Sequence, residues 1–153
     1  MYTISLAHVE DAPAMFDLQQ RAFVEEGRRS GTRDIPPLTE RLDALINHIQ
    51  KQTALVARDD GKLIGSIRGI VDSQVCTVRA LVVDASYRGR GVGSALLNAL
   101  ERSLPDVTRF CLTTNTVMER NVPFYERHGY CVSELTRHSE LVVLAQMTKV
   151  IDH

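Results

Sequence analysis

The pattern of apolar and polar positions is clearest in the segment from residue 78 to residue 104. It opens on an apolar, valine-rich run, Val78 to Val83, which predicts a buried strand because β-branched side chains pack well on a pleated surface. Leucines then recur at intervals of three and four, on one face of a helix: Leu96, Leu97, Leu100 and Leu104. The segment therefore predicts a strand, a polar corner and a helix in succession.

Further strand patterns lie before and after this segment. Residues 2–7 alternate as a half-buried strand does, and the later patterns lie at residues 53–58, 63–72 and 108–114. The stretch 130–151 holds two more strand-like runs that separate near Ser139 and Glu140. With the central run, the chain therefore carries about seven strands.

Helical spacing recurs at about residues 11–25, 39–50 and 121–128. Asp11 and Asn121 are the expected N-caps of the first and last of these helices, because a proline follows each at the first turn. Residues 25–37, rich in charge, glycine and proline, are expected to form one long loop. The order of elements predicts an α/β (α+β) fold, one domain over residues 1–153, with a mixed sheet and helices on both faces.

Composition narrows the range of partners. The 18 basic and 19 acidic residues give a net charge of −1, so there is no global attraction to nucleic acid or to an anionic membrane. The chain has no run of eighteen apolar residues and no signal-peptide pattern, so a cytoplasmic location is expected. The three cysteines are odd in number and far apart, and the histidines lack ligand spacing, so neither disulfides nor a metal site are expected.

The polar corner after the central strand holds three glycines and two arginines, within Arg88–Ser94. Backbone N–H groups at the start of a helix can hold phosphate oxygens, and glycines let the backbone approach them closely. The spacing fits neither the nucleoside triphosphate loop, which needs a following lysine, nor the dinucleotide fingerprint. What remains is Arg-x-x-Gly-x-Gly, with Arg88, Gly91 and Gly93 in the named places.

This motif resembles the acyl-CoA-binding signature of the GCN5-related N-acetyltransferase (GNAT) family. The segment 81–87 looks like the family's fourth strand and corner, and the segment 123–130 looks like its conserved block near the end of the domain. The similarity covers about residues 53–150 well and the first fifty residues weakly. It implies the GNAT fold, with a mostly antiparallel sheet, and an acetyl-CoA-dependent N-acetyltransferase that uses no metal.

The resemblance also implies roles for particular residues. Tyr125 matches the tyrosine that donates a proton to the thiolate of coenzyme A, and a phenol stays protonated at neutral pH. The usual place of the coenzyme-binding asparagine is Met118 here, so Asn121 is the better candidate and Asn115 the second. With Tyr125 and Asn121, the expected coenzyme-binding residues are Leu81, Val82, Val83, Arg88, Gly89, Arg90, Gly91, Val92, Gly93 and Ser94.

The acceptor site is less defined. In the family the region of residues 25–37 borders the acceptor, so Glu25 and Glu26 could hold a cationic amine, or Arg28, Arg29 and Arg33 a carboxylate. The family's frequent acidic residue on the central strand is Thr77 here. The general base therefore stays open among Glu25, Glu26, Asp72 and a water chain, unless the amine binds already neutral.

Three functions remain at this stage. The first is transfer of an acetyl group to a primary amine, on a small molecule or a protein, by direct attack on the thioester. The second is a non-catalytic module that senses acyl-CoA, and the third is a nucleotide-phosphate binder that uses the same glycine corner. Nothing in the residues demonstrates a homodimer, although the family allows one.

Overall fold

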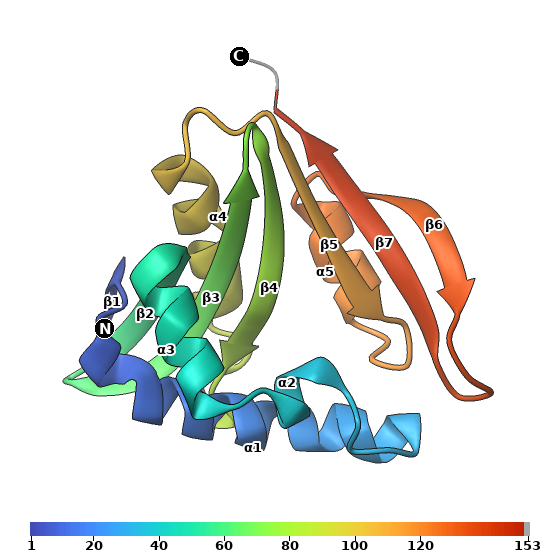
Figure 1. The fold of residues 1–153 in the computed structure, drawn as a ribbon, viewed down its shortest axis with the longest axis horizontal. Coiled ribbons are helices and arrows are strands. Elements are labelled where there is room, and N and C mark those ends of the chain that lie inside the picture. The colour runs from blue at the N-terminus through green and yellow to red at the C-terminus, as the bar shows by residue number, and fades with distance from the viewer. Residues whose placement is uncertain (152–153) are drawn as a thin grey trace.

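The computed structural model describes residues 1–151, which form one seven-stranded sheet in the order β1-β2-β3-β4-β5-β7-β6 (Figure 1). Of its neighbouring pairs only β4 and β5 are parallel, so the predicted mixed, mostly antiparallel sheet is confirmed. The strands are β1 (Tyr2–Leu6), β2 (Thr53–Asp59), β3 (Lys62–Asp72), β4 (Val75–Val83), β5 (Arg109–Asn115), β6 (Cys131–Arg137) and β7 (Val143–Val150).

The helices cover both faces of this sheet, as the sequence predicted (Figure 1). They are α1 (Ala12–Ser30), α2 (Pro36–Thr39), α3 (Leu42–Lys51), α4 (Val92–Ser103) and α5 (Asn121–Arg127), with 3-10 turns η1 (Val9–Asp11) and η2 (Ala85–Tyr87). Within the described residues, no helix combines the length and the apolar character needed to cross a bilayer.

Strand β2 shows how the alternation of side chains divides the core into two. Leu55 and Ala57 point to the face that the leucines of α4 cover, whereas Ala54 and Val56 point to the face covered by α1 and α3. Alternation along a strand sends successive side chains to opposite faces, so both faces of β2 are buried. This explains why residues 54–57 read as a continuous apolar run.

The first helix is longer than the sequence predicted, and the expected loop at residues 25–37 is therefore partly wrong. Helix α1 continues to Ser30 and ends at Gly31, whose φ of 76° is the left-handed conformation typical of a helix end. Gly27 lies inside α1 at a point where α2 comes close. A Cβ at this position would lie 2.8 Å from Leu38 Cδ1 of α2, so a glycine fits best here. The glycine that indicated a loop is instead a point of close helix packing.

Of the two N-caps expected from the sequence, Asp11 is confirmed as the N-cap residue of α1, although its side chain does not bond to that helix, and Asn121 is wrong. The carboxylate of Asp11 accepts the N–H of His8 at 2.8 Å and forms an ion pair with Arg58. Arg120 is the N-cap of α5, and the amide of Asn121 instead donates to Thr114 Oγ1 at 3.0 Å. Both side chains therefore form contacts outside the helix that they were expected to cap.

The feature that positions the site is a split between the two parallel strands. β4 pairs with β5 only through Val75, Cys76 and Thr77, and the strands then diverge (Figure 1). Beyond Thr77, β4 keeps its pairing with β3 but is interrupted opposite Ile67, where Ala80 has a φ of 51°. Because the pairing with β5 ends at Thr77, residues 78–83 have one partner strand and an open edge on the side of β5.

Candidate active site

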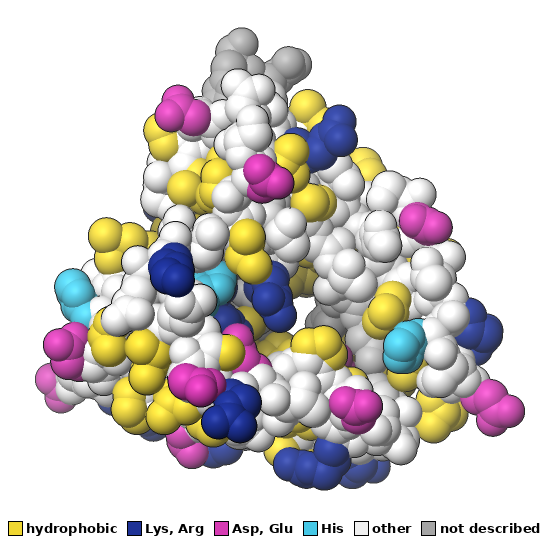
Figure 2. All heavy atoms as spheres, viewed as in Figure 1, with side chains coloured by type: hydrophobic (Ala, Val, Ile, Leu, Met, Phe, Trp, Pro, Cys, Tyr) yellow, Lys and Arg dark blue, Asp and Glu magenta, His cyan; other side chains and the backbone are white. Residues whose placement is uncertain are grey.

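The face that carries α1 is hollowed between the part of the molecule over β4 and the part over β5, as Figure 2 shows. One side of the hollow is the open edge of β4, where Leu81 and Val83 are half-buried. Helix α1 packs against both β3 and β4 near the wide end of the split. A narrow ligand could therefore lie along β4 as an added strand would, with backbone groups as partners.

The glycine corner lies where β4 ends and α4 begins. Gly89 has a φ of 77° and Gly91, the N-cap of α4, a φ of 81°, so both positions favour glycine. The first backbone bond of the helix runs from Ala95 N–H to Gly91 O at 3.0 Å. The N–H groups of Val92, Gly93 and Ser94 precede it and have no acceptor within the helix, which is the arrangement that binds anions at helix starts.

Side chains of β2 and of the residues that follow β4 hold this corner in place. Asp84 accepts the N–H of Ser86 at 2.9 Å and its hydroxyl at 2.6 Å, which stabilises the 3-10 turn. Tyr87 donates its hydroxyl to Asp59 at 2.7 Å, and the guanidinium of Arg90 lies 5.2 Å from the centre of the Tyr87 ring. The corner is therefore anchored before any ligand binds, which limits the entropy lost on binding.

Helix α5 closes the site beside the start of α4. A Cβ built on Gly93 would lie 3.6 Å from Phe124 Cζ and 3.7 Å from Val83 Cγ2, so α4, α5 and the end of β4 meet at this glycine. The hydroxyl of Ser94 lies 2.9 Å from Nε2 of His128, which joins the two helices a second time. Burial lowers the pKa of His128, so its ring favours the neutral form.

Tyr125 lies on α5 among aromatic rings. Its ring is edge-on to Phe124 at 5.1 Å between centroids and to Tyr130 at 5.8 Å. Burial, together with the negative charge of Glu26, raises the pKa of Tyr125 to about 12. The phenol is therefore protonated at every physiological pH. Its electrostatic interaction with Glu26 also places that carboxylate of α1 near Tyr125.

The structure separates the two neighbouring glutamates of α1. Glu25 is exposed, and its hydrogen bond with Arg28 lowers the pKa of its carboxyl group. Glu26 is half-buried; burial raises the pKa of its carboxyl group, and a hydrogen bond with Asn115 offsets part of that rise. Only Glu26 therefore faces Tyr125 and the end of β5.

Long-range contacts fix the end of α1 against the loop after β5. The amide of Asn115 donates to Ser30 Oγ at 2.9 Å, and both side chains are buried. Arg29 reaches Glu119 at 3.0 Å and Met118 Sδ at 3.8 Å. These contacts place the carboxylate of Glu26 at the wide end of the split.

A buried polar cluster, which the sequence analysis missed, lies beside the hollow on the side of β3 and β4. It consists of Arg68 of β3, Glu40 after α2 and Gln19 of α1. Arg68 is 2% exposed and donates to Glu40 Oε1 at 2.7 Å, to Glu40 Oε2 at 2.9 Å and to Gln19 Oε1 at 2.8 Å. An arginine inside an apolar strand was the one available signal, since a buried charge needs a partner.

Several residues considered from the sequence lie away from this arrangement. Asp72 is exposed at the end of β3, where β4 and β5 are still paired. Arg33 is exposed after α1, beside a shallow depression. Among residues 1–151, no group of three or more His, Cys, Asp or Glu side chains could hold a metal ion, and the three cysteines are free.

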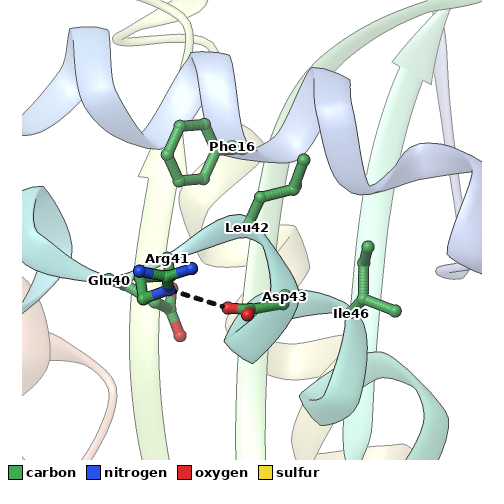
Figure 3. Close-up of a pocket in the computed structure, with 6 residues that line it drawn as sticks. All are labelled: Phe16, Glu40, Arg41, Leu42, Asp43 and Ile46. Atoms are coloured by element: carbon green, nitrogen blue, oxygen red, sulfur yellow. Dashed lines mark hydrogen bonds and ion pairs between the residues drawn. The ribbon is translucent and has the colours of Figure 1, made fainter.

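A larger depression, of about 550 Å³, lies between α1 and the start of α3 (Figure 3). Phe16 and Ile46 form its apolar part, and Arg41 Nε lies 3.3 Å from Asp43 Oδ1 at its edge. None of the residues predicted to bind the coenzyme lines it. The split between β4 and β5, with its backbone groups and titratable side chains, is therefore the candidate site.

Comparison with known proteins decides the family. The model of the acetyltransferase (GNAT) family matches residues 12–130. The chain belongs to this family. The GNAT chain is 28% identical over 134 residues to YjcF of Bacillus subtilis strain 168, an uncharacterized N-acetyltransferase, and the match covers 86% of each chain. These matches support the predicted activity of an acetyl-CoA-dependent N-acetyltransferase. They do not identify the acceptor of the acetyl group.

Solved structures share the fold of this GNAT chain. The ribosomal-protein-S18-alanine N-acetyltransferase of Escherichia coli aligns with a TM-score of 0.84 and 20% identity over 100% of this chain and 96% of that one. The PaiA N-acetyltransferase of Thermoplasma acidophilum, solved in complex with coenzyme A, aligns with a TM-score of 0.80 and 20% identity over 99% of both chains. At 20% identity, these two matches show that the proteins share a fold.

Proposed function

We propose that this enzyme transfers the acetyl group of acetyl-CoA directly to a primary amine, with Tyr125 as the general acid and Glu26 as the general base. One observation carries the proposal. The open edge of β4 leads to the free N–H groups at the start of α4, and the Glu26–Tyr125 pair lies at the wide end of the same split. Acyl transfer from a thioester needs an anion site, a donor channel, a base and an acid in one place.

In the proposed complex the diphosphate of the coenzyme binds the N–H groups of residues 92–94, with Arg88 and Arg90 beside it. Both the unpaired N–H groups and the helix dipole favour an anion there. The pantetheine arm then lies along β4 beside Leu81 and Val83, whose edge is open. A backbone N–H on this edge would stabilise the oxyanion of the tetrahedral intermediate.

The proposed proton transfers balance between the two side chains. The amine nitrogen attacks the thioester carbon, and the new C–N bond forms as Glu26 takes a proton from the nitrogen. The C–S bond then breaks, and the thiolate takes the phenolic proton of Tyr125. Because the charge of Glu26 is one cause of the high pKa of Tyr125, protonation of Glu26 makes Tyr125 a stronger acid at the step that needs it.

A direct test combines catalysis with binding. The purified enzyme is mixed with acetyl-CoA and a panel of amines, and release of free thiol is followed together with the mass of each product. Binding of coenzyme A is measured by calorimetry in parallel. Thiol release that requires an amine supports the proposal, whereas coenzyme binding without turnover on any amine would indicate the sensor module instead. ATP that displaces coenzyme A would indicate the nucleotide binder.

Replacing Gly91 with valine is expected to weaken coenzyme A binding about tenfold to a hundredfold, since a β-branched residue in the left-handed region costs about 1–3 kcal/mol and crowds the diphosphate. Gly61, in the turn between β2 and β3, is a matched control. It has the same φ of 81°, and a Cβ at either glycine meets nothing within 4 Å. Calorimetry should show the loss for Gly91→Val only; equal losses would place the diphosphate elsewhere.

Replacing Glu26 with glutamine is expected to lower kcat/KM about a hundredfold, within the range for loss of a general base. In the wild type, kcat/KM should fall as the pH falls through the pKa of Glu26, which burial raises above that of an ordinary glutamate. This acidic limb should disappear in Glu26→Gln and remain in the neighbouring control Glu25→Gln. An unchanged pH profile in Glu26→Gln would assign the base to another group.

A further inference from the structure

Arg79 is a charged residue at the hollow for which the mechanism above has no use. It lies on β4 directly opposite Arg68 of β3, so both side chains lie on the face that carries α1 and α3. Its charge acts on the carboxyl group of Glu40 and on the ring of His48, two groups of that same face. Figure 2 shows basic side chains at the edge of the hollow on the side of β4.

The charges around Arg79 do not balance. Glu40 is already bound by both terminal nitrogens of Arg68 and by Gln19. Burial lowers the pKa of His48, whose Nε2 lies 3.0 Å from the carbonyl oxygen of Thr53, so this ring is neutral at physiological pH. Two guanidiniums therefore face one carboxylate, which leaves an excess of one positive charge on this side of the hollow.

The guanidinium of Arg79 is the accessible part of this charge. Arg68 is buried, whereas Arg79 is exposed, and no hydrogen bond or ion pair within residues 1–151 engages the side chain of Arg79. An arginine left in this way offers a planar pair of N–H donors, which matches the two oxygens of a carboxylate. It is thus open to an anionic group that enters the hollow.

Arg79 also lies close to the proposed reaction centre. It comes directly before the bulge at Ala80 and two residues before Leu81, about 7 Å along the strand at the usual rise per residue. Glu26, the proposed base, lies across the split near the end of β5. An amine held by Glu26 could therefore carry a negative group to Arg79 without leaving the hollow.

We propose that the acceptor carries a carboxylate in addition to its reactive amine, and that Arg79 binds this carboxylate. The inference rests on the proposed function and names its substrate class, free amino acids or short peptides as opposed to polyamines. A single excess positive charge matches the single negative charge of a carboxylate. A phosphate monoester carries a charge between about −1.5 and −2 at neutral pH, so about half a negative charge or more would stay unbalanced. Glu26 and Arg79 then recognise the amine and the carboxylate of one acceptor.

The test compares acceptors that differ only in the carboxylate. L-lysine is paired with cadaverine, and each of several L-amino acids with its amide, with kcat/KM taken from thiol release. The wild type should prefer the carboxylate member about tenfold to a hundredfold, the range of a charge-assisted hydrogen-bonded pair. Arg79→Gln should remove this preference mainly through KM, and Arg79→Lys should restore part of it.

Two controls separate this inference from the function on which it rests. Arg109, an exposed arginine of β5 at the closed end of the split, is replaced by glutamine and should keep the preference. Coenzyme A affinity, measured by calorimetry, should not change in Arg79→Gln. Two results overturn the inference alone: equal kcat/KM values for acceptors with and without the carboxylate, or a preference that remains in Arg79→Gln. Coenzyme binding without acetylation of any acceptor overturns the proposed function and the inference together.

Discussion

Replacing Tyr125 with phenylalanine is expected to lower kcat about a thousandfold, within the range for loss of a general acid, and to leave coenzyme A affinity unchanged. The ring, with its edge-on contacts to Phe124 and Tyr130, stays in place in the variant. Only the hydroxyl is lost, so the departing thiolate has no proton donor. Steady-state kinetics with acetyl-CoA and calorimetry with coenzyme A measure the two effects separately.

The pH dependence of the wild type gives a second check on Tyr125. A proton donor with a pKa of about 12 stays protonated as the pH rises, so this residue should cause no loss of kcat on the alkaline side below about pH 10. Tyr130→Phe is the matched control, because Tyr130 lies beside Tyr125 but donates to Glu101 Oε2 at 2.8 Å. If Tyr125→Phe and Tyr130→Phe have equal kcat values, the proton comes from another donor.

Local sequence was sufficient to predict the central strand, the glycine corner and α4. These features depend on neighbours in the chain: β-branched residues that favour a strand, glycines that adopt positive φ at residues 89 and 91, and leucines on one helix face. The resemblance to one family rested on this segment together with residues 123–130. The family model that matches residues 12–130 now confirms that resemblance.

The distinction between Glu25 and Glu26 could not be predicted, because distant contacts decide it. The end of α1 is held by the bond between Ser30 and Asn115, 85 residues apart, and by the ion pair between Arg29 and Glu119, 90 residues apart. Those contacts turn residues 25–30 into helix and bury one glutamate of the two. A single sequence shows charged residues and glycine there, which is equally typical of a loop.

The kink in β4 was also beyond a reading of the sequence. Ala80 adopts a φ of 51°, a conformation that alanine rarely adopts and that no neighbouring residue type demands. It follows from the pairing with β3, whose register shifts between Ser66 and Arg68. Such strained positions persist when the surrounding structure holds them, and they are frequent at functional sites.

Replacing Arg68 with methionine is expected to lower the free energy of unfolding by about 3–5 kcal/mol, the usual effect of removing one partner of a buried ion pair. The side chains of Arg68 and Glu40 are 3% and 13% exposed, so the carboxylate would stay in the interior without its cation. Urea unfolding at pH 7 measures this loss. Arg41→Met, which removes an exposed pair with Asp43, should cost less than about 1 kcal/mol.

The pH dependence of this loss identifies its electrostatic cause. Burial alone would raise the pKa of Glu40, but hydrogen bonds from Arg68 and Gln19 lower it below that of an ordinary glutamate. The pair therefore stabilises the wild type above the unfolded-state pKa of about 4.3, and this stability is lost as the pH falls through the lower folded-state pKa. In Arg68→Met the carboxyl group of Glu40 takes up a proton more readily, so the loss of unfolding free energy should shrink from pH 7 toward pH 4.

The double variant Arg68→Met, Glu40→Met should recover most of the stability at pH 7, because neither charge is then buried. A deficit that is independent of pH and remains in the double variant would assign the effect to lost packing instead.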